Sequence, residues 1–301
     1  MSTSNNDRCA PRSARLVTGM LMLALASSAY AQLTFDLGKI LSAPQKIQNA
    51  TSELPQDKEI ALGRGIAARL IGAMPLVRDE AIQRYVNDVG WWLVSHTERR
   101  GLPWRFAVTD TSTLGAFATP GGHVLITRGL LALMQDEHQL AGVLAHEMAH
   151  VLRKHHLAEI MREAQTSLAS DVATTALSFF SGSNSTEGQI LGAIGKEAFG
   201  AGMELYGTGL SREDELDADA HGTVIATRAG YDPAGLASLL FTLDAVGPNT
   251  EAYALMSSTH PSARDRIVQI EAQLERGLER HEGTLRDEAR FGHMQQRLAQ
   301  R

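Results

Sequence analysis

The segment that most constrains this chain is His146-Glu147-Met148-Ala149-His150, an H-E-x-x-H pattern. Apolar residues recur at helical spacing over residues 140–144, and Gln135-Asp136 offers a capping start, so the pattern is predicted to lie on an amphipathic helix. Side chains four residues apart on a helix differ by about 40° in direction, so both imidazoles can bind one zinc ion. Glu147 falls beside them, where a carboxylate can take a proton from a water molecule that the metal acidifies.

The same five-residue pattern also occurs by chance on surface helices. Here it lies on a helix with an apolar stripe, and further acidic and histidine residues follow it. These two features favour the zinc interpretation.

A zinc site of this kind needs a third protein ligand. His156 follows His150 by six residues, but residues 151–154 are predicted to continue the helix. A continuous helix would rotate His156 by about 240° from His150, away from the metal. We therefore predict that His155 and His156 are surface residues near the end of the helix.

The better source of the third ligand is the acidic segment at residues 211–222, which opens another apolar helix. The helix dipole would explain some acidic residues there, but not five carboxylates in seven residues. Glu215 and Asp219 are four apart and share a face, so one can bind the metal while the other holds a ligand imidazole through its second nitrogen. Spacing alone does not distinguish Glu215 from Glu213 or Asp214 as the ligand.

Three segments together resemble the zinc metallopeptidase family M48, which includes the CAAX prenyl proteases and the HtpX-type and BepA-type proteases. They are residues 116–131, the H-E-x-x-H helix, and Ser211-Arg212-x-x-Glu215-x-x-Ala218-Asp219. The resemblance implies that Glu215 is the third zinc ligand and that Asp219 is the carboxylate behind a ligand imidazole. Gly115 departs from the pattern, since many relatives carry Asn at that place.

Thr259-His260-Pro261, with Arg266 six residues after the histidine, is a fourth match to the family. The resemblance implies that His260 helps to stabilise the oxyanion of the reaction and that Arg266 lies behind the metal ligands. The matches span roughly residues 57–270. They fit the soluble periplasmic branch of the family best, without a full tetratricopeptide domain.

The remaining sequence predicts a predominantly helical α+β fold. Helical spacing covers residues 57–71 and 79–98, and alternation at residues 104–108, with candidate strands at 116–118 and 123–127, predicts a small sheet. From Gly129 the chain is predicted to be helical almost to its end, except for a polar loop at 181–185. The fold class that we expect is a zincin-like metallopeptidase domain with a small sheet beside the H-E-x-x-H helix.

The first thirty-one residues are predicted to be a cleaved signal peptide. Basic residues precede an apolar run at residues 16–26, and Ala29-Tyr30-Ala31 is a small-x-small cleavage pattern. The run is short for a membrane span, although an uncleaved N-terminal membrane helix is the alternative. The expected domains are then an extended lead-in at 32–56, the metallopeptidase domain at 57–270 and a helical tail at 271–301.

Charge and cysteine content exclude some classes of function. The formal net charge of −6 disfavours a nucleic-acid partner, because phosphate binding requires a basic surface. The chain has one cysteine, Cys9, which lies in the predicted signal peptide, so neither an internal disulfide nor a cysteine-rich metal site is expected. We expect no stable membrane span after signal cleavage.

Together these features predict a zinc endopeptidase with one Zn²⁺ per chain that hydrolyses unfolded or misassembled exported proteins in the periplasm. Outer-membrane assembly components are a second expected class of partner. The catalytic residues would be Glu147 and His260. Two alternatives stay open: a zinc-stabilised chaperone or assembly factor for outer-membrane proteins, and a hydrolase for cell-wall peptides.

A substrate peptide is expected to add as a strand along the sheet edge at residues 116–118 or 123–126, held by main-chain hydrogen bonds. The expected substrate-binding residues are Ala116, Phe117, Ala118, Gly121 and Gly122. Two forms of gating are also conceivable. The loop at 181–189 could close over the cleft, or His260 could block the open position at the metal.

Overall fold

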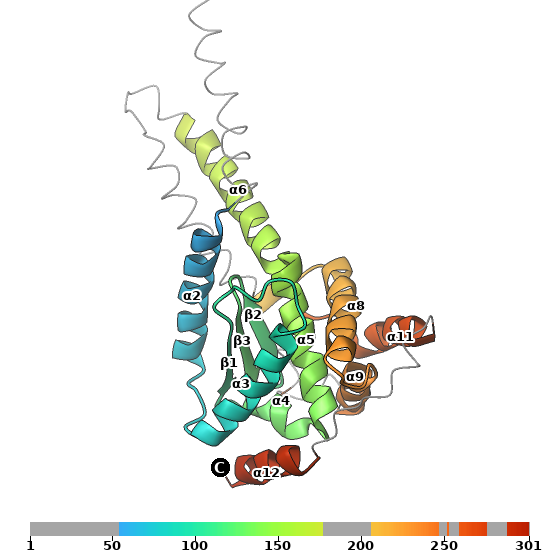
Figure 1. Ribbon diagram of the computed structural model, residues 1–301. Coiled ribbons are helices and arrows are strands. Elements are labelled where there is room, and N and C mark those ends of the chain that lie inside the picture. The colour runs from blue at the N-terminus through green and yellow to red at the C-terminus, as the bar shows by residue number, and fades with distance from the viewer. Residues whose placement is uncertain (1–53, 177–205, 247–251, 253–258, 276–287, 301) are drawn as a thin grey trace, which may run out of the picture.

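The structure is a computed structural model that describes residues 54–176, 206–246, 252, 259–275 and 288–300 (Figure 1). Its helices are α2 (Gln56–Ala73), α3 (Glu80–Val94), α4 (Arg128–Leu133), α5 (Glu137–Arg153), α6 (His155–Ala176), α8 (Arg212–Arg228), α9 (Gly235–Val246), α11 (Ala263–Gln273) and α12 (Glu288–Ala299). Its strands are β1 (Arg105–Thr109), β2 (Ala116–Thr119) and β3 (His123–Thr127). The predominantly helical α+β fold with a small sheet is confirmed. The predicted signal peptide and the loop at 181–189 lie outside the described residues.

The sheet has the order β1-β3-β2, with β3 parallel to β1 and antiparallel to β2. Alternate residues of β3 face opposite layers, as the two-residue period of a strand requires. Val124 and Ile126 join a core with α3, α5 and α9, whereas Leu125 joins a smaller core with α2 and α6. Because β3 is paired on both sides, residues 123–126 cannot form a substrate edge, and that part of the prediction is wrong.

The outer edge of β1 is covered by two side-chain amides of α3. Val108 N–H donates to Gln83 Oε1 at 2.8 Å, and Gln83 Nε2 donates to the Val108 carbonyl at 2.8 Å. Asn87 forms the same pair of bonds with Phe106. The two amides satisfy the backbone groups that an edge strand would otherwise leave open. The other edge of the sheet is β2, where the backbone of Ala118 bonds to Tyr206 and Glu147.

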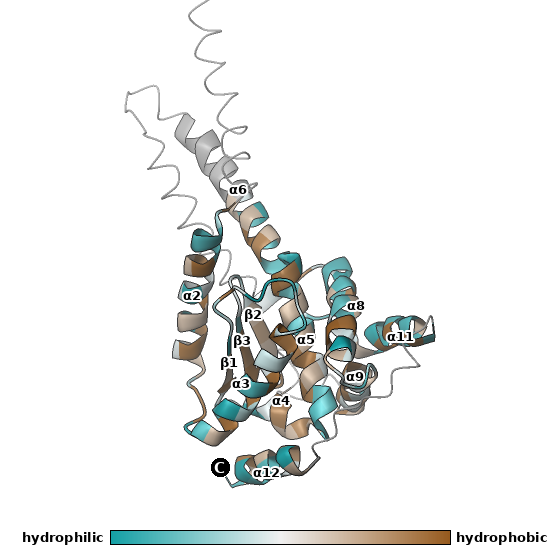
Figure 2. Cartoon of the chain, viewed as in Figure 1, coloured by the Kyte–Doolittle hydropathy of each residue, from teal (hydrophilic) through white to brown (hydrophobic). Residues whose placement is uncertain are grey.

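Helix α5 lies in the middle of the molecule, between the sheet and α8 (Figure 1). The Asp136 side chain caps its start by accepting from Gln139 N–H at 2.9 Å, as predicted. Hydrophobic residues gather on the sheet and along α5, and hydrophilic residues colour much of α8, α11 and α12 (Figure 2). The H-E-x-x-H segment is thus buried on a central helix.

One glycine lets α8 approach α5 at the H-E-x-x-H segment. A Cβ atom at Gly222 would lie 2.8 Å from the Cα of His146, closer than two carbon atoms can pack. The helices cross here with backbone almost touching backbone. This close approach brings the acidic start of α8 to the histidines of α5.

Helix α5 ends at Arg153, because Lys154 has the left-handed backbone conformation (φ 61°, ψ 28°). Lys154 is the one non-glycine residue with positive φ in the described part of the chain. Helix α6 begins at the next residue, His155, with a new direction. The prediction that the helix continues through residues 151–154 is therefore wrong at its last residue.

The C-terminal helix α12 packs against α3 and α4, and Phe291, Met294 and Leu298 enter the larger core. Arg290 of α12 donates to the buried Glu137 at the first residue of α5, at 2.6 and 3.2 Å. Tyr85 and Tyr231 donate to the same carboxylate at 2.6 and 3.0 Å. This carboxylate links α12, α3 and the segment before α9 to the start of the central helix.

None of the described helices combines the length and the apolar character that crossing a bilayer requires.

Candidate metal centre

Three buried side chains converge where α5 meets α8. His146 Nε2 and His150 Nε2 lie 3.1 Å apart, and Glu215 Oε1 lies 3.4 Å from His150 Nε2. Glu215 Oε2 lies 3.6 Å from His146 Nε2. The ligand atoms of this trio all lie within 4.8 Å of one another, an arrangement that can hold one metal ion.

The local sequence explains why Glu215, and neither Glu213 nor Asp214, lies against His146 and His150. The Ser211 hydroxyl caps α8 by accepting from Asp214 N–H at 3.1 Å, which fixes the start of the helix. Glu215 then lies one turn into the helix on the face against α5 and is buried. Glu213 is exposed and Asp214 is half-buried, so neither reaches the histidines.

The polar atoms of the trio fit a divalent cation. Glu215 Oε2 is buried and has no hydrogen-bond partner among the described residues. Burial lowers the pKa of both histidines, so both imidazoles are neutral, as metal ligands must be. Burial also raises the pKa of Glu215 to about 8, and Arg266 opposes this shift only in part, so a further positive charge would stabilise the carboxylate. Two histidines and one carboxylate are a donor set typical of catalytic zinc sites.

Asp219 and Arg266 stand behind His146. Asp219 Oδ1 lies 2.9 Å from His146 Nδ1, and Arg266 donates to both oxygens of Asp219 at 2.6 and 2.9 Å. Burial alone would raise the pKa of Asp219, but Arg266 and His146 hold it well below its ordinary value. Asp219 is therefore a carboxylate that fixes His146 with its Nε2 free, because Nδ1 donates its proton to Asp219.

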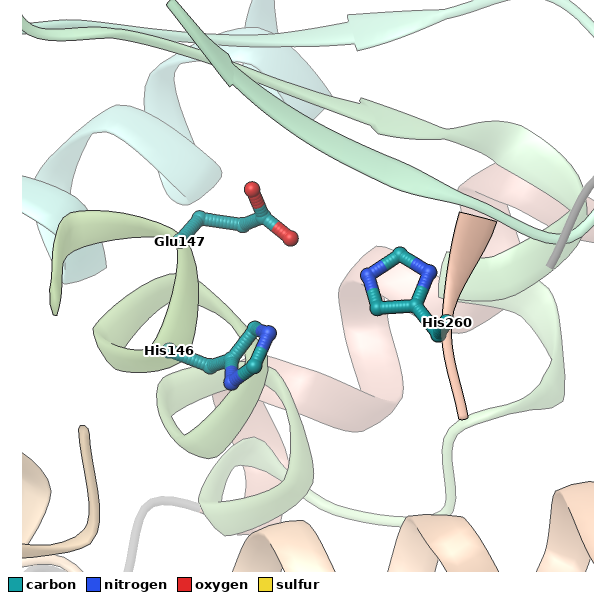
Figure 3. A group of neighbouring side chains, drawn as sticks. All are labelled: His146, Glu147 and His260. Atoms are coloured by element: carbon teal, nitrogen blue, oxygen red, sulfur yellow. The ribbon is translucent and has the colours of Figure 1, made fainter. Parts of the chain in front are cut away.

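Glu147 and His260 face the same space from opposite sides, Glu147 from α5 and His260 from the segment before α11 (Figure 3). With His146 they form a second trio whose atoms lie within 4.8 Å of one another. Burial raises the pKa of Glu147 to about 8, opposed by Arg266 and by the N–H of Ala118, which donates to the Glu147 carboxylate. Thr259 Oγ1 lies 2.8 Å from His260 Nδ1, and His260 Nε2 lies 3.7 Å from Glu215 Oε2.

A cavity of about 20 Å³ adjoins these side chains, room for about one water molecule or ion. Of the predicted substrate-binding residues, Ala116 and Phe117 line it. Ala118 lies beside the cavity. Its N–H donates to the Glu147 carboxylate, and its carbonyl accepts from Tyr206 Oη at 2.5 Å. Gly121 and Gly122 do not line it; they are buried against Ile60 of α2 and Trp104.

The cavity is also lined by three residues that the sequence did not indicate, namely Tyr206, Gly209 and Leu210. Thr259, from the fourth family match, and His156, which was predicted to face away from the metal, line it as well. The His156 ring stacks on Tyr206, with centroids 5.3 Å apart, and lies 5.0 Å from the His150 ring. His155 is buried, with its Nδ1 3.0 Å from His150 Nδ1. The predictions that both are surface residues and that His156 faces away from the metal are wrong, because the chain turns at Lys154.

No feature of the sequence marks that turn. Lys154 is neither Gly nor Asn, the residues that usually adopt the left-handed conformation at the end of a helix. The sequence does not predict Tyr206 as a site residue either, because it lies far along the chain from the residues that it contacts.

Comparison with known proteins agrees with this geometry. The "Beta-barrel assembly-enhancing protease" of Escherichia coli (strain K12) is 28% identical over 225 residues, which cover 75% of this chain and 45% of that protein. The "Mitochondrial metalloendopeptidase OMA1" of Schizosaccharomyces pombe is 29% identical over 190 residues, covering 63% of this chain and 52% of that protein. The "Protease HtpX" of Legionella pneumophila is 27% identical over 238 residues, covering 69% and 81%.

The chain thus spans less than half the length of the first of these relatives. The model of peptidase family M48 matches residues 78–274, which contain every residue of both trios together with Asp219 and Arg266. The resemblance inferred from the sequence motifs is confirmed, and the chain belongs to peptidase family M48.

Proposed function

We propose that this protein is a zinc-dependent endopeptidase of the periplasm that hydrolyses unfolded or misassembled exported proteins. The observation that carries the proposal is the convergence of His146, His150 and Glu215 with the Glu147 carboxylate beside them, next to the edge strand β2. A purely structural zinc site has no need of an additional buried carboxylate.

In this proposal the trio holds one Zn²⁺, which when bound polarises a carbonyl and acidifies a water molecule. Glu147 takes the proton from that water and later gives it to the leaving amine. Burial raises the pKa of Glu147 in the metal-free site, and the positive charge of a bound Zn²⁺ would lower it again, toward a carboxylate that can accept the proton.

His260 is proposed to stabilise the developing oxyanion. When the Thr259 hydroxyl donates to His260 Nδ1, the imidazole proton resides on Nε2, which faces the trio. An N–H donor at that position supplies the stabilisation that acyl-transfer enzymes use.

A peptide substrate is proposed to add along the edge of β2, with Ala116, Phe117 and Ala118 as its contacts. This edge lies beside Glu147, and main-chain hydrogen bonding tolerates many side chains, as cleavage of unfolded proteins requires. The carbonyl of Ala118 already accepts a bond from Tyr206 and its N–H donates to Glu147, so a peptide would have to share or replace these bonds.

The periplasmic location and the outer-membrane context are supported by the predicted signal peptide and by the name of the Escherichia coli relative. The two alternatives, an assembly factor that binds without cutting and a cell-wall peptide hydrolase, lead to different results in the following test.

The test compares the wild type with Glu147→Gln and with the exposed control Glu80→Gln. Glu147→Gln is expected to keep its zinc, measured by metal analysis, and to lose at least ~100-fold in the rate of casein digestion, the lower range for a general base. Glu80→Gln is expected to cut normally. Full digestion by Glu147→Gln would refute the proposed base, and release of cell-wall peptides without casein cleavage would favour the hydrolase alternative. Protection of an outer-membrane client by Glu147→Gln, with no cleavage by the wild type, would favour the assembly factor.

A further inference from the structure

We infer that His155 is a positioning residue of the metal centre, which orients His150 through a His150–His155–Asp217 chain of hydrogen bonds. The inference rests on the proposed function, because it concerns the zinc that this function requires. His155 belongs neither to the trio of ligands nor to the pair Asp219 and Arg266.

The distances define one consistent set of proton positions. His150 Nε2 faces the other ligands and must keep its lone pair for a metal, so the proton of His150 resides on Nδ1. That N–H points at His155 Nδ1, 3.0 Å away, which must accept it. The proton of His155 therefore resides on Nε2, where Asp217 Oδ2 accepts it at 3.0 Å.

The left-handed turn at Lys154 makes this contact possible. On a continuous helix a residue five positions after His150 would point about 140° away from it. The turn brings His155 back against the His150 ring, with centroids 5.2 Å apart. A residue with a side chain adopts this conformation at a cost in free energy, and such strain is retained mostly where a site requires the geometry.

The two ligand histidines are thus held in different ways. His146 donates directly to Asp219, which is fully buried and paired with Arg266. His150 reaches its carboxylate only through His155, and Asp217 has a side chain that is 30% exposed. Asp217 also accepts from Arg153 at 2.8 Å and lies 3.3 Å from His221 Nδ1, so it joins the end of α5 to α8.

A role in packing alone would also place an imidazole here, and the experiment must separate the two roles. His155→Leu keeps most of the volume and removes both hydrogen bonds. His155→Asn keeps an acceptor oxygen close to the position of Nδ1 but cannot reach Asp217. His221→Leu removes an exposed imidazole from the other oxygen of Asp217 and serves as the matched control.

The dissociation constant for zinc is measured on the full chain by competition with a chromophoric chelator. The His155→Leu variant is expected to bind zinc about 10- to 100-fold more weakly than the wild type, the usual effect of removing a residue that hydrogen-bonds to a metal ligand. The His155→Asn variant is expected to recover most of the lost zinc affinity. Asp217→Ala changes a half-exposed residue and is expected to weaken zinc binding severalfold. His221→Leu is expected to weaken it by less than about twofold, because the contact between His221 and Asp217 is exposed and contributes little. The melting temperatures of the metal-free variants are expected to change little. Zinc is expected to stabilise the variants less than it stabilises the wild type, by about 1.4 kcal/mol for each tenfold loss of zinc affinity.

The inference is overturned if folded His155→Leu binds zinc like the wild type. It is also overturned if Leu and Asn lose metal-free stability equally and Asn recovers no affinity, since packing alone would explain that result. If His155→Leu does not fold, unchanged zinc affinity in Asp217→Ala, or an Nδ1–H tautomer of His155 in long-range ¹H–¹⁵N spectra of the zinc-loaded wild type, overturns it instead. Failure of the proposed function has a different signature, because the wild type would then bind no zinc or Glu147→Gln would remain active.

Discussion

Glu215 and Asp219 lie four residues apart on α8, so a single helix face supplies one carboxylate to the metal position and another to His146. Arg266 lies 4.0 Å from Glu215 and pairs with Asp219. This arginine balances part of the negative charge of the site without reaching the face of Glu215 that points at the histidines. The acidic neighbours of Glu215 differ from it in exposure rather than in chemistry.

That difference leads to a prediction for single substitutions. Glu215→Gln is expected to weaken zinc binding by more than the ~10–100-fold typical of outer partners, because it removes a charged ligand. Glu213→Gln, at an exposed position two residues earlier, is expected to leave zinc affinity unchanged. Chelator competition measures both. Equal affinities in the two variants would contradict the assignment of Glu215.

The H-E-x-x-H pattern and the acidic cluster were sufficient to predict His146, Glu147 and His150, and the family motif selected Glu215 from its neighbours. His155 could not be predicted, because its position depends on the backbone of Lys154, and lysine has no preference for that conformation. Tyr206 could not be predicted either, since its contact with Ala118 joins residues far apart in the sequence.

At the scale of elements, the crossing of α5 and α8 decides the geometry of the centre. The side chains that we propose as ligands, two on α5 and one on α8, meet because Gly222 allows the backbones to come together at His146. Any side chain there must push α8 outward and take Glu215 and Asp219 with it. The helix contact and the metal centre are therefore a single structural unit.

Gly222→Ala is accordingly expected to destabilise the protein by about 1–3 kcal/mol, as overpacking of a core does, and to weaken zinc binding at least tenfold. Gly72→Ala is the matched control, because a Cβ atom at Gly72 meets nothing within 4 Å. Gly72 lies in the last turn of α2, where that change should stabilise the protein by less than about 1 kcal/mol. Urea unfolding of the two metal-free variants measures the difference. A Gly222→Ala variant as stable as Gly72→Ala would show that the helices can separate freely.

Periodicity predicted α2, α3 and the three strands well, because each pattern is local. The order β1-β3-β2 is not local, and so the prediction treated the centre strand as a possible edge. The sequence also did not predict that the Gln83 and Asn87 side chains bond to the backbone of β1, because polar residues on an amphipathic helix ordinarily face water.

Across the whole molecule, α12 joins the two ends of the described chain. Arg297 of α12 donates to Asp79 at 2.9 and 3.2 Å, and Asp79 also caps the start of α3. The hydrogen bond from Arg297 lowers the pKa of Asp79; burial opposes this shift, and the N–H of Ile82 adds to it. The stability of the domain therefore includes a term that depends on pH.

The sign of that term follows from the lowered pKa. The stabilisation is present above the ordinary aspartate pKa of about 3.9 and is lost as the pH falls through the folded-state value. Asp79→Asn retains a good cap but no charge, so near pH 7 it should be less stable than the wild type by up to about 1 kcal/mol, since Arg297 is half exposed. Urea unfolding should show this gap closing as the pH falls below about 4. When Arg297 is replaced by Gln, the stability difference between the chain with Asp79 and its Asp79→Asn variant should be small at every pH. A difference that does not change with pH when Arg297 is present would contradict the ion pair between Asp79 and Arg297.

The amides of Gln83 and Asn87 have a consequence for self-association. A sheet that is open on both sides can recruit one extended chain after another and grow into a fibre. Here the amides of Gln83 and Asn87 already occupy backbone groups of β1, so no second chain can pair with the sheet at these positions without displacing them. Edge-to-edge pairing between two copies of the domain through β1 is thereby opposed.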